Sequence, residues 1–168
     1  MAARVLAVAL FKEGKYVQSF PAFGVERRGA PVAAFLRVDE RPILLRTNIY
    51  EPDHIVVLDP TLIGMVDLTQ GLKRGGWIVL NSDRPPEHYK FKGYRVGTVD
   101  ANRIALKHGL GSRTHPIVNT AILGAFARAT GMVGKEALAE AIKEEIPVKK
   151  MENVQAAMEA YEEMRVKG

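Results

Sequence analysis

The apolar residues of this chain follow two different patterns along its length. Residues 2–12 are good helix formers and are apolar nearly all around a helical wheel, which predicts a buried helix that ends at Gly14. Short continuous apolar runs within 54–58 and 76–80 are typical of parallel strands that are covered on both faces. We therefore expect both of these strands to be central in a sheet and dry.

Weaker signals predict further strands and loops around these two runs. Residues 32–38 alternate between the two faces of a strand, 43–46 predict a short strand or a hairpin return, and 94–99 predict another strand. Proline, glycine and the lack of periodicity favour loops at 20–31 and 81–93.

The last third of the chain is predicted to be helical. Asp100 is placed to cap one helix, and residues 117–130 form a strongly apolar helix that ends at Gly131. Two more helices are expected at 134–145 and 152–166, the last with its apolar residues on one stripe.

Strands that alternate with helices predict an α/β fold. We expect one domain of 168 residues, with a Rossmann-like, doubly wound, mainly parallel sheet, helices on both faces and a helical C-terminal third. In such sheets ligands lie beyond the carboxyl ends of the strands. The loops that meet this condition are 59–61, 81–84 and 100–102.

The amino-acid composition excludes several kinds of functional site. The chain has no cysteine, which excludes disulfides, thiolate catalysis and any Fe–S cluster held by cysteines of this chain. The four histidines lack the spacing of a zinc site, so we expect no metal ligand among them. They are His54, His88, His108 and His115. A net charge of +5 and a pI of about 9.5 suit anionic ligands, acidic partners or nucleic acid.

The same composition bears on location and source. No apolar run approaches the length of a membrane span. The charged residues 12–15 read as a helix end, and no small-residue cleavage site of a signal peptide is present, so we expect a cytoplasmic protein. Low Asn and Gln content and Glu/Lys-rich helices indicate a thermophile.

The most unusual segment holds two adjacent arginines between glycines. Gly24 and Gly29 flank it, and Arg27 and Arg28 present forks of donors that suit phosphate or carboxylate. Glu26 is placed to hold one arginine in position. The alternative interpretation is a surface turn with an internal ion pair.

Two other features are compatible with an anion. Asn119 and Thr120 stand at the start of an apolar helix, where free N–H groups attract negative charge, although plain helix capping explains them as well. Lys149 and Lys150 precede the last helix, where an anion, an acidic partner or simple solvent exposure accounts for them.

The sequence contains no signature of a self-contained enzyme. A nucleophile elbow, a Walker loop, a Gly-x-Gly-x-x-Gly loop and an evident pair of acid/base carboxylates are all missing. We therefore expect no catalytic residue and no metal site in this chain, and no activity from the chain alone.

Six segments together resemble the gamma subunits of pyruvate and 2-oxoisovalerate:ferredoxin oxidoreductases. The long segment 20–32 carries the most specific similarity, and five shorter motifs follow in the same order as in the family. They are 50–53, 59–62, 100–101, 119–126 and 152–162. The resemblance covers nearly the whole chain.

The resemblance implies a role inside a multisubunit enzyme. Such enzymes oxidatively decarboxylate a 2-oxoacid to an acyl-coenzyme A and reduce ferredoxin, or run in reverse as synthases. Thiamine diphosphate with Mg²⁺ and the Fe–S clusters belong to the alpha, beta and delta subunits, so this chain holds no cofactor alone. The gamma subunit contributes to coenzyme A binding and packs on alpha.

On this basis, coenzyme A or a neighbouring subunit is the expected contact of two groups of residues. The first is the arginine segment, with Gly24, Glu26, Arg27, Arg28 and Gly29. The second is the helix start at Asn119 and Thr120.

The start of the chain differs from the family pattern. The family normally opens with a strand and a Gly-Arg-Gly-Gly-Gln-Gly loop, whereas this chain begins inside the helix that follows them. We therefore expect that strand and loop to precede it, or a partner to fill their place. The alternatives in function are a stand-alone nucleotide- or RNA-binding α/β module and the related subunit of an indolepyruvate oxidoreductase. No strand interleaves aromatic and basic residues in the way that stacks bases, which disfavours RNA.

We also expect an obligate interface on the helices. The chain carries more apolar helix than one small sheet normally covers, at 2–11, 117–126 and the stripe on 154–161. Obligate interfaces are large and apolar, so part of this surface is predicted to bind another subunit.

Overall fold

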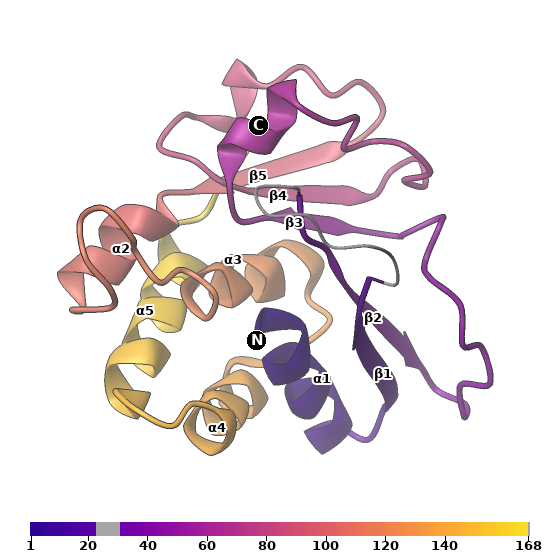
Figure 1. Ribbon diagram of the computed structural model, residues 1–168, viewed down its shortest axis with the longest axis horizontal. Coiled ribbons are helices and arrows are strands. Elements are labelled where there is room, and N and C mark those ends of the chain that lie inside the picture. Colours follow the sequence, from indigo (N-terminus) through magenta and orange to yellow (C-terminus); the bar gives the residue numbers. More distant parts are fainter. Residues whose placement is uncertain (23–30, 168) are drawn as a thin grey trace.

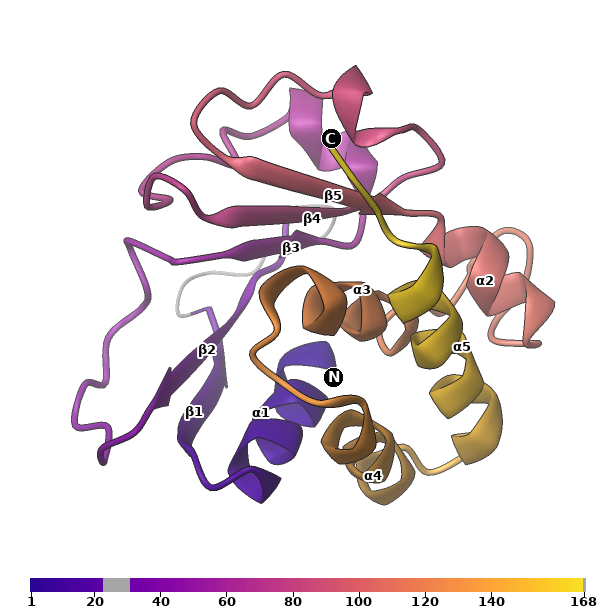
Figure 2. The ribbon, with the colours of Figure 1, turned by 180° about the vertical axis from the view of Figure 1, so that it is seen from behind.

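The computed structural model describes residues 1–22 and 31–167 of the chain. A four-stranded sheet lies on a layer of α-helices, and a two-stranded antiparallel sheet stands beside them (Figures 1 and 2). The α/β class, the mainly parallel sheet and the helical C-terminal third predicted from the sequence are confirmed.

The larger sheet has the order β3-β4-β5-β6, with β3, β4 and β5 parallel and β6 antiparallel to β5. Its strands are β3 (Ile55–Val57), β4 (Trp77–Asn81), β5 (Arg95–Val99) and β6 (Arg165–Val166). Every residue of β4 is buried, as the apolar run at 76–80 predicted.

The prediction that the run at 54–58 forms a central strand is wrong, because β3 lies at the edge of this sheet. Ile55 and Val56 are only half-buried. The faces of β3 are nevertheless covered, since Val56 packs towards the helices and Ile55 packs towards the loops on the other side. An apolar run indicates that both faces of a strand are covered. It does not indicate whether the strand lies at the centre or at the edge of the sheet.

The α-helices cover one face of the sheet only, which corrects the expectation of helices on both faces. They are α1 (Ala2–Lys12), α2 (Ala101–Lys107), α3 (Ala121–Thr130), α4 (Lys135–Glu145) and α5 (Lys150–Glu163). The opposite face packs against the loops 58–76 and 82–94, which include the 3₁₀ turns η1 (Pro60–Gly64) and η2 (Pro86–His88). Prolines and glycines in both loops prevent a long helix there.

A hairpin that the sequence only half predicted forms the smaller sheet. β1 (Tyr16–Pro21) pairs with β2 (Ala34–Asp39), from Tyr16 opposite Asp39 to Pro21 opposite Ala34. β2 agrees with the strand expected at 32–38, whereas β1 was missed because its end overlaps the stretch interpreted as a loop. No strand is assigned at 43–46, where the sequence predicted a short strand or a hairpin return.

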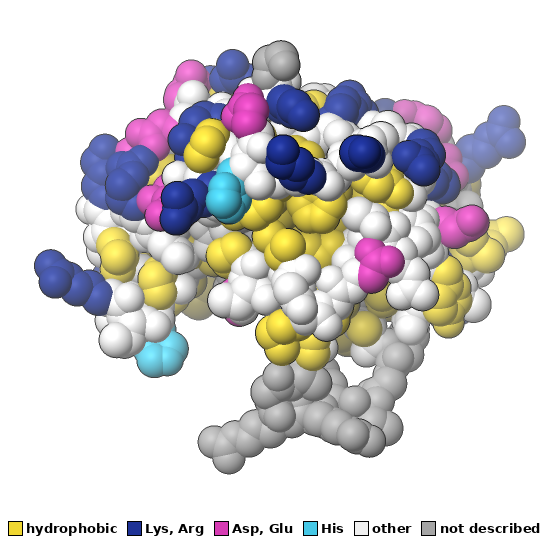
Figure 3. All heavy atoms as spheres, turned by 90° about the horizontal axis from the view of Figure 1, so that it is seen from above, with side chains coloured by type: hydrophobic (Ala, Val, Ile, Leu, Met, Phe, Trp, Pro, Cys, Tyr) yellow, Lys and Arg dark blue, Asp and Glu magenta, His cyan; other side chains and the backbone are white. Residues whose placement is uncertain are grey.

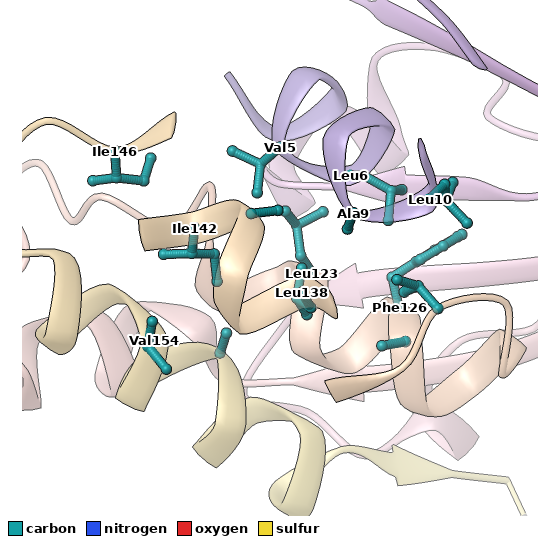
Figure 4. Close-up of a cluster of buried hydrophobic side chains, with 14 residues drawn as sticks. Val5, Leu6, Ala9, Leu10, Leu123, Phe126, Leu138, Ile142, Ile146 and Val154 are labelled. Carbon is teal, nitrogen blue, oxygen red and sulfur yellow. The ribbon is translucent and has the colours of Figure 1, made fainter. Parts of the chain in front are cut away.

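The helices bury their apolar surfaces against one another (Figure 4). Val5 and Leu10 of α1 join Leu138 and Ile142 of α4 and Phe126 of α3 in one cluster. The apolar helix surfaces that we expected to form a subunit interface are therefore largely internal. The helix α1 is also not buried all round, because Phe11 is exposed.

The helix ends follow the local chemistry predicted for them. The Asp100 carboxylate accepts the N–H of Arg103 at 3.0 Å, and Gly131 ends α3 with a left-handed φ of 64°. The last helix ends at Glu163 rather than 166, because the chain turns there to form β6 beside β5.

Candidate anion-binding site

The three loops expected to bind a ligand do meet at the carboxyl ends of the parallel strands. The side chain of Asn81 joins them, since its Nδ2 donates to Leu58 O at 2.8 Å and to Asn102 Oδ1 at 3.0 Å. Its Oδ1 accepts the N–H of Ala101 at 3.0 Å. Asn81 is buried and its amide is fully used inside the protein, so it serves to hold this edge together.

The hollow at this carboxyl edge has mixed charge. Its volume is about 350 Å³, and it is lined by Asp83, Asp100, Arg103, Glu163 and Arg165. Arg103 pairs with Glu163, and Arg165 Nη2 donates to the backbone oxygen of Asp83 at 2.9 Å. Three carboxylates against two guanidinium groups make this hollow a poor match for a phosphate.

A second hollow, which we call the basic hollow, lies at the opposite edge of the sheet, beside the amino ends of β3, β4 and β5. Its volume is about 400 Å³. It is lined by Val38, Asp53, His54, Lys73, Arg74, Gly75, Gly76, Arg95 and Met132. Three cations face one carboxylate here, so the excess charge is positive.

The segment that carries these cations is basic as a whole. Residues 73–95 contain six Lys and Arg but only two Asp and Glu, which amounts to four of the five net positive charges of the chain. Figure 3 looks onto the loop-covered face of the sheet, where Lys and Arg side chains, with some Asp and Glu among them, form a band along one side of an apolar centre. Charge of one sign at a hollow raises the local concentration of an opposite ligand.

The arginines of the basic hollow are held in defined positions. Arg95 Nε donates to Gly75 O at 2.8 Å, and its guanidinium lies 4.8 Å from the centre of the Trp77 ring. Arg74 donates to Lys92 O at 3.3 Å and lies 5.8 Å from the Tyr94 ring centre. Both guanidinium groups keep further N–H donors for a ligand.

Two glycines allow the backbone to close the basic hollow. Gly75 has a left-handed φ of 80°. A Cβ on Gly76 would lie 2.2 Å from Asp53 O, so only glycine lets the start of β4 approach residue 53 this closely. Lys73 Nζ lies 3.2 Å from Asp53 Oδ1 and therefore shares its charge with that carboxylate.

His54 is a structural member of the basic hollow. Its Nδ1 accepts the N–H of Trp77 at 3.1 Å, which requires an unprotonated Nδ1. Burial lowers the pKa of His54 below 6.5, and Arg95 lowers it further although Asp53 opposes this. At neutral pH the ring is uncharged, so the charge of the basic hollow comes from Lys73, Arg74 and Arg95.

The predicted site residues divide into two groups in the structure. Gly24, Glu26, Arg27, Arg28 and Gly29 lie outside the described residues, within the segment that connects β1 to β2. No side-chain contact is therefore assigned to this group.

The second predicted group, at the start of α3, is largely engaged inside the protein. Thr120 is buried and its hydroxyl donates to Asn153 Oδ1 of α5, while Asn119 is half-buried. The N–H groups of Ile122 and Leu123 already donate to backbone oxygens, which leaves few free donors at this helix start. Thr120 thus joins α3 to α5.

The other lysines considered in the sequence are also engaged. Lys149 Nζ donates to Gly109 O and Lys150 Nζ donates to Lys143 O, each at 2.5 Å. By contrast, Lys73, Arg74 and Arg95 were missed. The available signal was a pair of cations, two glycines and an apolar strand in direct succession at 73–80.

Neither a metal-binding cluster nor a membrane-spanning helix is found in the described part of the chain. Residues 1–22 and 31–167 contain no group of three or more His, Asp or Glu arranged to hold a metal ion. None of the described helices is long and apolar enough to cross a membrane.

A match to a protein-family model identifies the family of this chain. The model of the pyruvate ferredoxin/flavodoxin oxidoreductase family matches residues 1–163. The chain belongs to this family. Within it, the chain is a gamma, or PorC, subunit of a 2-oxoacid:ferredoxin oxidoreductase.

Individual relatives agree with this placement. A protein of Thermococcus kodakarensis named pyruvate/ketoisovalerate oxidoreductases common subunit gamma is 54% identical over 95% of this chain and 87% of its own length. The pyruvate synthase subunit PorC of Methanothermobacter thermautotrophicus is 50% identical over 97% of this chain and 87% of its own length. Their sources agree with the indication of a thermophile.

A solved structure shows the same fold. The pyruvate oxidoreductase subunit PORC of Thermotoga maritima superposes with a TM-score of 0.80 at 33% identity. The match covers 99% of this chain and 90% of the Thermotoga chain.

Proposed function

We propose that this chain supplies part of the coenzyme A site of its oxidoreductase and helps to assemble the complex. The complex converts pyruvate or a branched-chain 2-oxoacid, coenzyme A and oxidised ferredoxin to acyl-coenzyme A, CO₂ and ferredoxin reduced by the two electrons released, or runs in reverse. Alpha, beta and delta subunits would supply thiamine diphosphate chemistry with Mg²⁺. They would also hold the Fe–S clusters, because this chain has no cysteine to ligate one.

The basic hollow is the observation that carries the proposal. Coenzyme A is polyanionic, with a diphosphate and a ribose phosphate, and guanidinium groups bind phosphate oxygens through charge-assisted hydrogen bonds. Arg74 and Arg95 are oriented by their backbone and aromatic contacts, and Lys73, which is paired with Asp53, adds a point charge. Arg27 and Arg28 form a second cation pair that we propose for the same ligand.

The chemical contribution of this chain would be positioning. A bound coenzyme A presents its thiol to the acyl group formed on a neighbouring subunit, and fixing two reactants near each other removes much of the entropic barrier. The residues of this chain would bind and orient the anionic end of the molecule, while bonds are made elsewhere in the complex.

The alternative of an RNA-binding module finds little support in the aromatic residues. Residues 89–95 do interleave aromatic and basic side chains, but they lie mainly in the loop before β5. Tyr89, Phe91 and Tyr94 pack against the buried face of the sheet. Rings in this position are not free to stack on bases.

The names of the relatives favour pyruvate or ketoisovalerate over indolepyruvate.

The assembled enzyme with altered cations tests this proposal. Changing Lys73 and Arg74 to Ala, or Arg27 and Arg28 to Ala, should raise the KM for coenzyme A at least tenfold, since each lost charge-assisted contact costs about 1.5 to 3 kcal/mol. The KM for the 2-oxoacid should stay the same. Arg113→Ala, an exposed arginine outside both groups, is the matched control. An unchanged KM for coenzyme A in both double variants would contradict the proposal.

A further inference from the structure

The loop between β2 and β3 exposes three large apolar side chains. We call residues 41–50 the apolar arm; Figure 1 shows it within the purple trace along the right-hand edge between β2 and β3. Leu44 is 87% exposed, Leu45 61% and Tyr50 73%. Exposed apolar side chains of this size that cluster within one segment are typical of an interaction surface.

The apolar arm is fixed to the hairpin beside it by polar contacts. Gln18 of β1 donates to Leu45 O at 2.7 Å. Arg37 of β2 donates to Asn48 O at 3.2 Å and to Thr47 Oγ1 at 3.4 Å, and also to Gln18 Oε1 at 2.8 Å. These contacts hold the arm backbone while its leucines face solvent, so little entropy remains to be lost on binding.

Basic residues flank the leucines. Arg41 and Arg46 are exposed, and neither forms a salt bridge within the described ranges 1–22 and 31–167. A surface that combines apolar anchors with unpaired cations matches an apolar cleft whose rim carries carboxylates. A second copy of this chain fits less well, because a symmetric contact would bring the same arginines together.

We propose that the apolar arm binds an apolar, acid-rimmed cleft on another subunit of the same oxidoreductase. This inference rests on the proposed assembly role and names the surface that performs it. It replaces the helix surfaces expected from the sequence, which are largely buried inside the chain. Leu44 and Leu45 would act as the anchors, and Arg41 and Arg46 would set the orientation.

Assembly of the complete complex tests whether the apolar arm binds another subunit. The chain is coexpressed with its partner subunits, one of which carries the affinity tag, and the amount recovered with that subunit is measured. Changing Leu44 and Leu45 together to Ser should reduce recovery at least tenfold without lowering the melting temperature of this chain. Val148→Ser removes a side chain that is 68% exposed before α5 and should assemble like the wild type.

Two further variants separate the contributions of charge and anchoring. Changing Arg41 and Arg46 together to Glu should weaken assembly and leave the fold intact, because both side chains are exposed. Arg37→Ala keeps both leucines but releases the arm, so it should give an intermediate loss.

The outcomes distinguish this inference from the proposed function. Normal assembly of the leucine and arginine variants would overturn the inference about the apolar arm. The coenzyme A proposal would still stand if the variants of the basic residues raise the KM for coenzyme A. A wild-type chain that recovers with no oxidoreductase subunit would contradict the proposed function itself. A chain that dimerises alone through Leu44 and Leu45, while the complex forms normally without them, would assign the arm to a second copy and overturn the inference.

Discussion

A single histidine holds the amino ends of two neighbouring strands together. His54 stands before β3 and accepts the N–H of Trp77, the first residue of β4. His54→Ala leaves this N–H without an acceptor in a buried position, which should reduce the free energy of unfolding by about 1 to 3 kcal/mol. His54→Asn places an amide oxygen near the position of Nδ1 and should restore most of the loss. Denaturant unfolding at neutral pH measures both effects.

The same histidine makes stability depend on pH. Burial holds the pKa of His54 below 6.5 in the folded protein, so the unfolded chain binds the proton more strongly. The contribution of neutral His54 to the free energy of unfolding is complete above about pH 6.5. It is lost as the pH falls through the lower pKa of the folded protein. His54→Asn should remove this part of the pH dependence; an identical profile in both proteins would contradict the assignment.

Glu159 gives a second pH dependence, at lower pH. Its carboxylate lies 2.8 Å from Lys107 Nζ and 2.5 Å from His108 Nε2, and its side chain is 15% exposed. Burial raises the pKa of Glu159, but hydrogen bonds from Lys107 and His108 outweigh it and lower the pKa to about 2.

The sign of this effect follows from the lowered pKa. The folded protein is favoured above the ordinary pKa of 4.5, and the benefit disappears as the pH falls towards 2. Glu159→Gln should therefore cost roughly 1 to 3 kcal/mol at pH 7 and almost nothing near pH 2. Unfolding curves between pH 7 and 2 measure the difference. A difference that does not change with pH would show that packing, rather than charge, is responsible.

Among the elements, α3 and α5 pack closely at a glycine. A Cβ on Gly124 of α3 would lie 1.7 Å from the backbone oxygen of Ala157 in α5. Gly124→Ala must push these helices apart, and we expect a loss of about 3 kcal/mol, at the upper end of what overpacking typically costs. Thermal or denaturant unfolding gives the value.

A second glycine provides the control. A Cβ on Gly64, at the end of η1, would meet nothing within 4 Å. Gly64→Ala should change stability by less than about 0.5 kcal/mol. If both variants unfold alike, the close contact between α3 and α5 is not the cause of the loss.

The elements show which features local sequence determines. Gly131 at the end of α3 and Asp100 before α2 act through neighbouring residues, so sequence alone predicted these boundaries. The edge position of β3 and the loops over one face depend on how distant segments pack, which no local pattern contains. The end of β1 overlaps the stretch interpreted as a loop, and its pairing with β2 across that stretch is not a local signal.

The candidate site shows the same limit. The arginines at 27 and 28 were visible in the sequence because they are adjacent. The cations of the basic hollow come from two segments, 73–74 and residue 95, and only the pairing of β4 with β5 brings them together. Thr120 looked available at a helix start, but the fold places Asn153 against it.

At the scale of the whole molecule, the largest concentration of positive charge and the apolar arm lie on different segments. The charge is concentrated in residues 73–95, and the most exposed leucine lies on the apolar arm. This separation fits a subunit that binds an anionic ligand at one surface and a partner at another.

Reconstitution of the complex tests the central claim most directly. Partner subunits are purified without this chain, and 2-oxoacid-dependent reduction of ferredoxin is measured over a range of coenzyme A concentrations, before and after the chain is added. We predict little activity from the partners alone, none from this chain alone, and full coenzyme A-dependent activity from the mixture. Full activity of the partners without this chain, with the same KM for coenzyme A, would contradict the account.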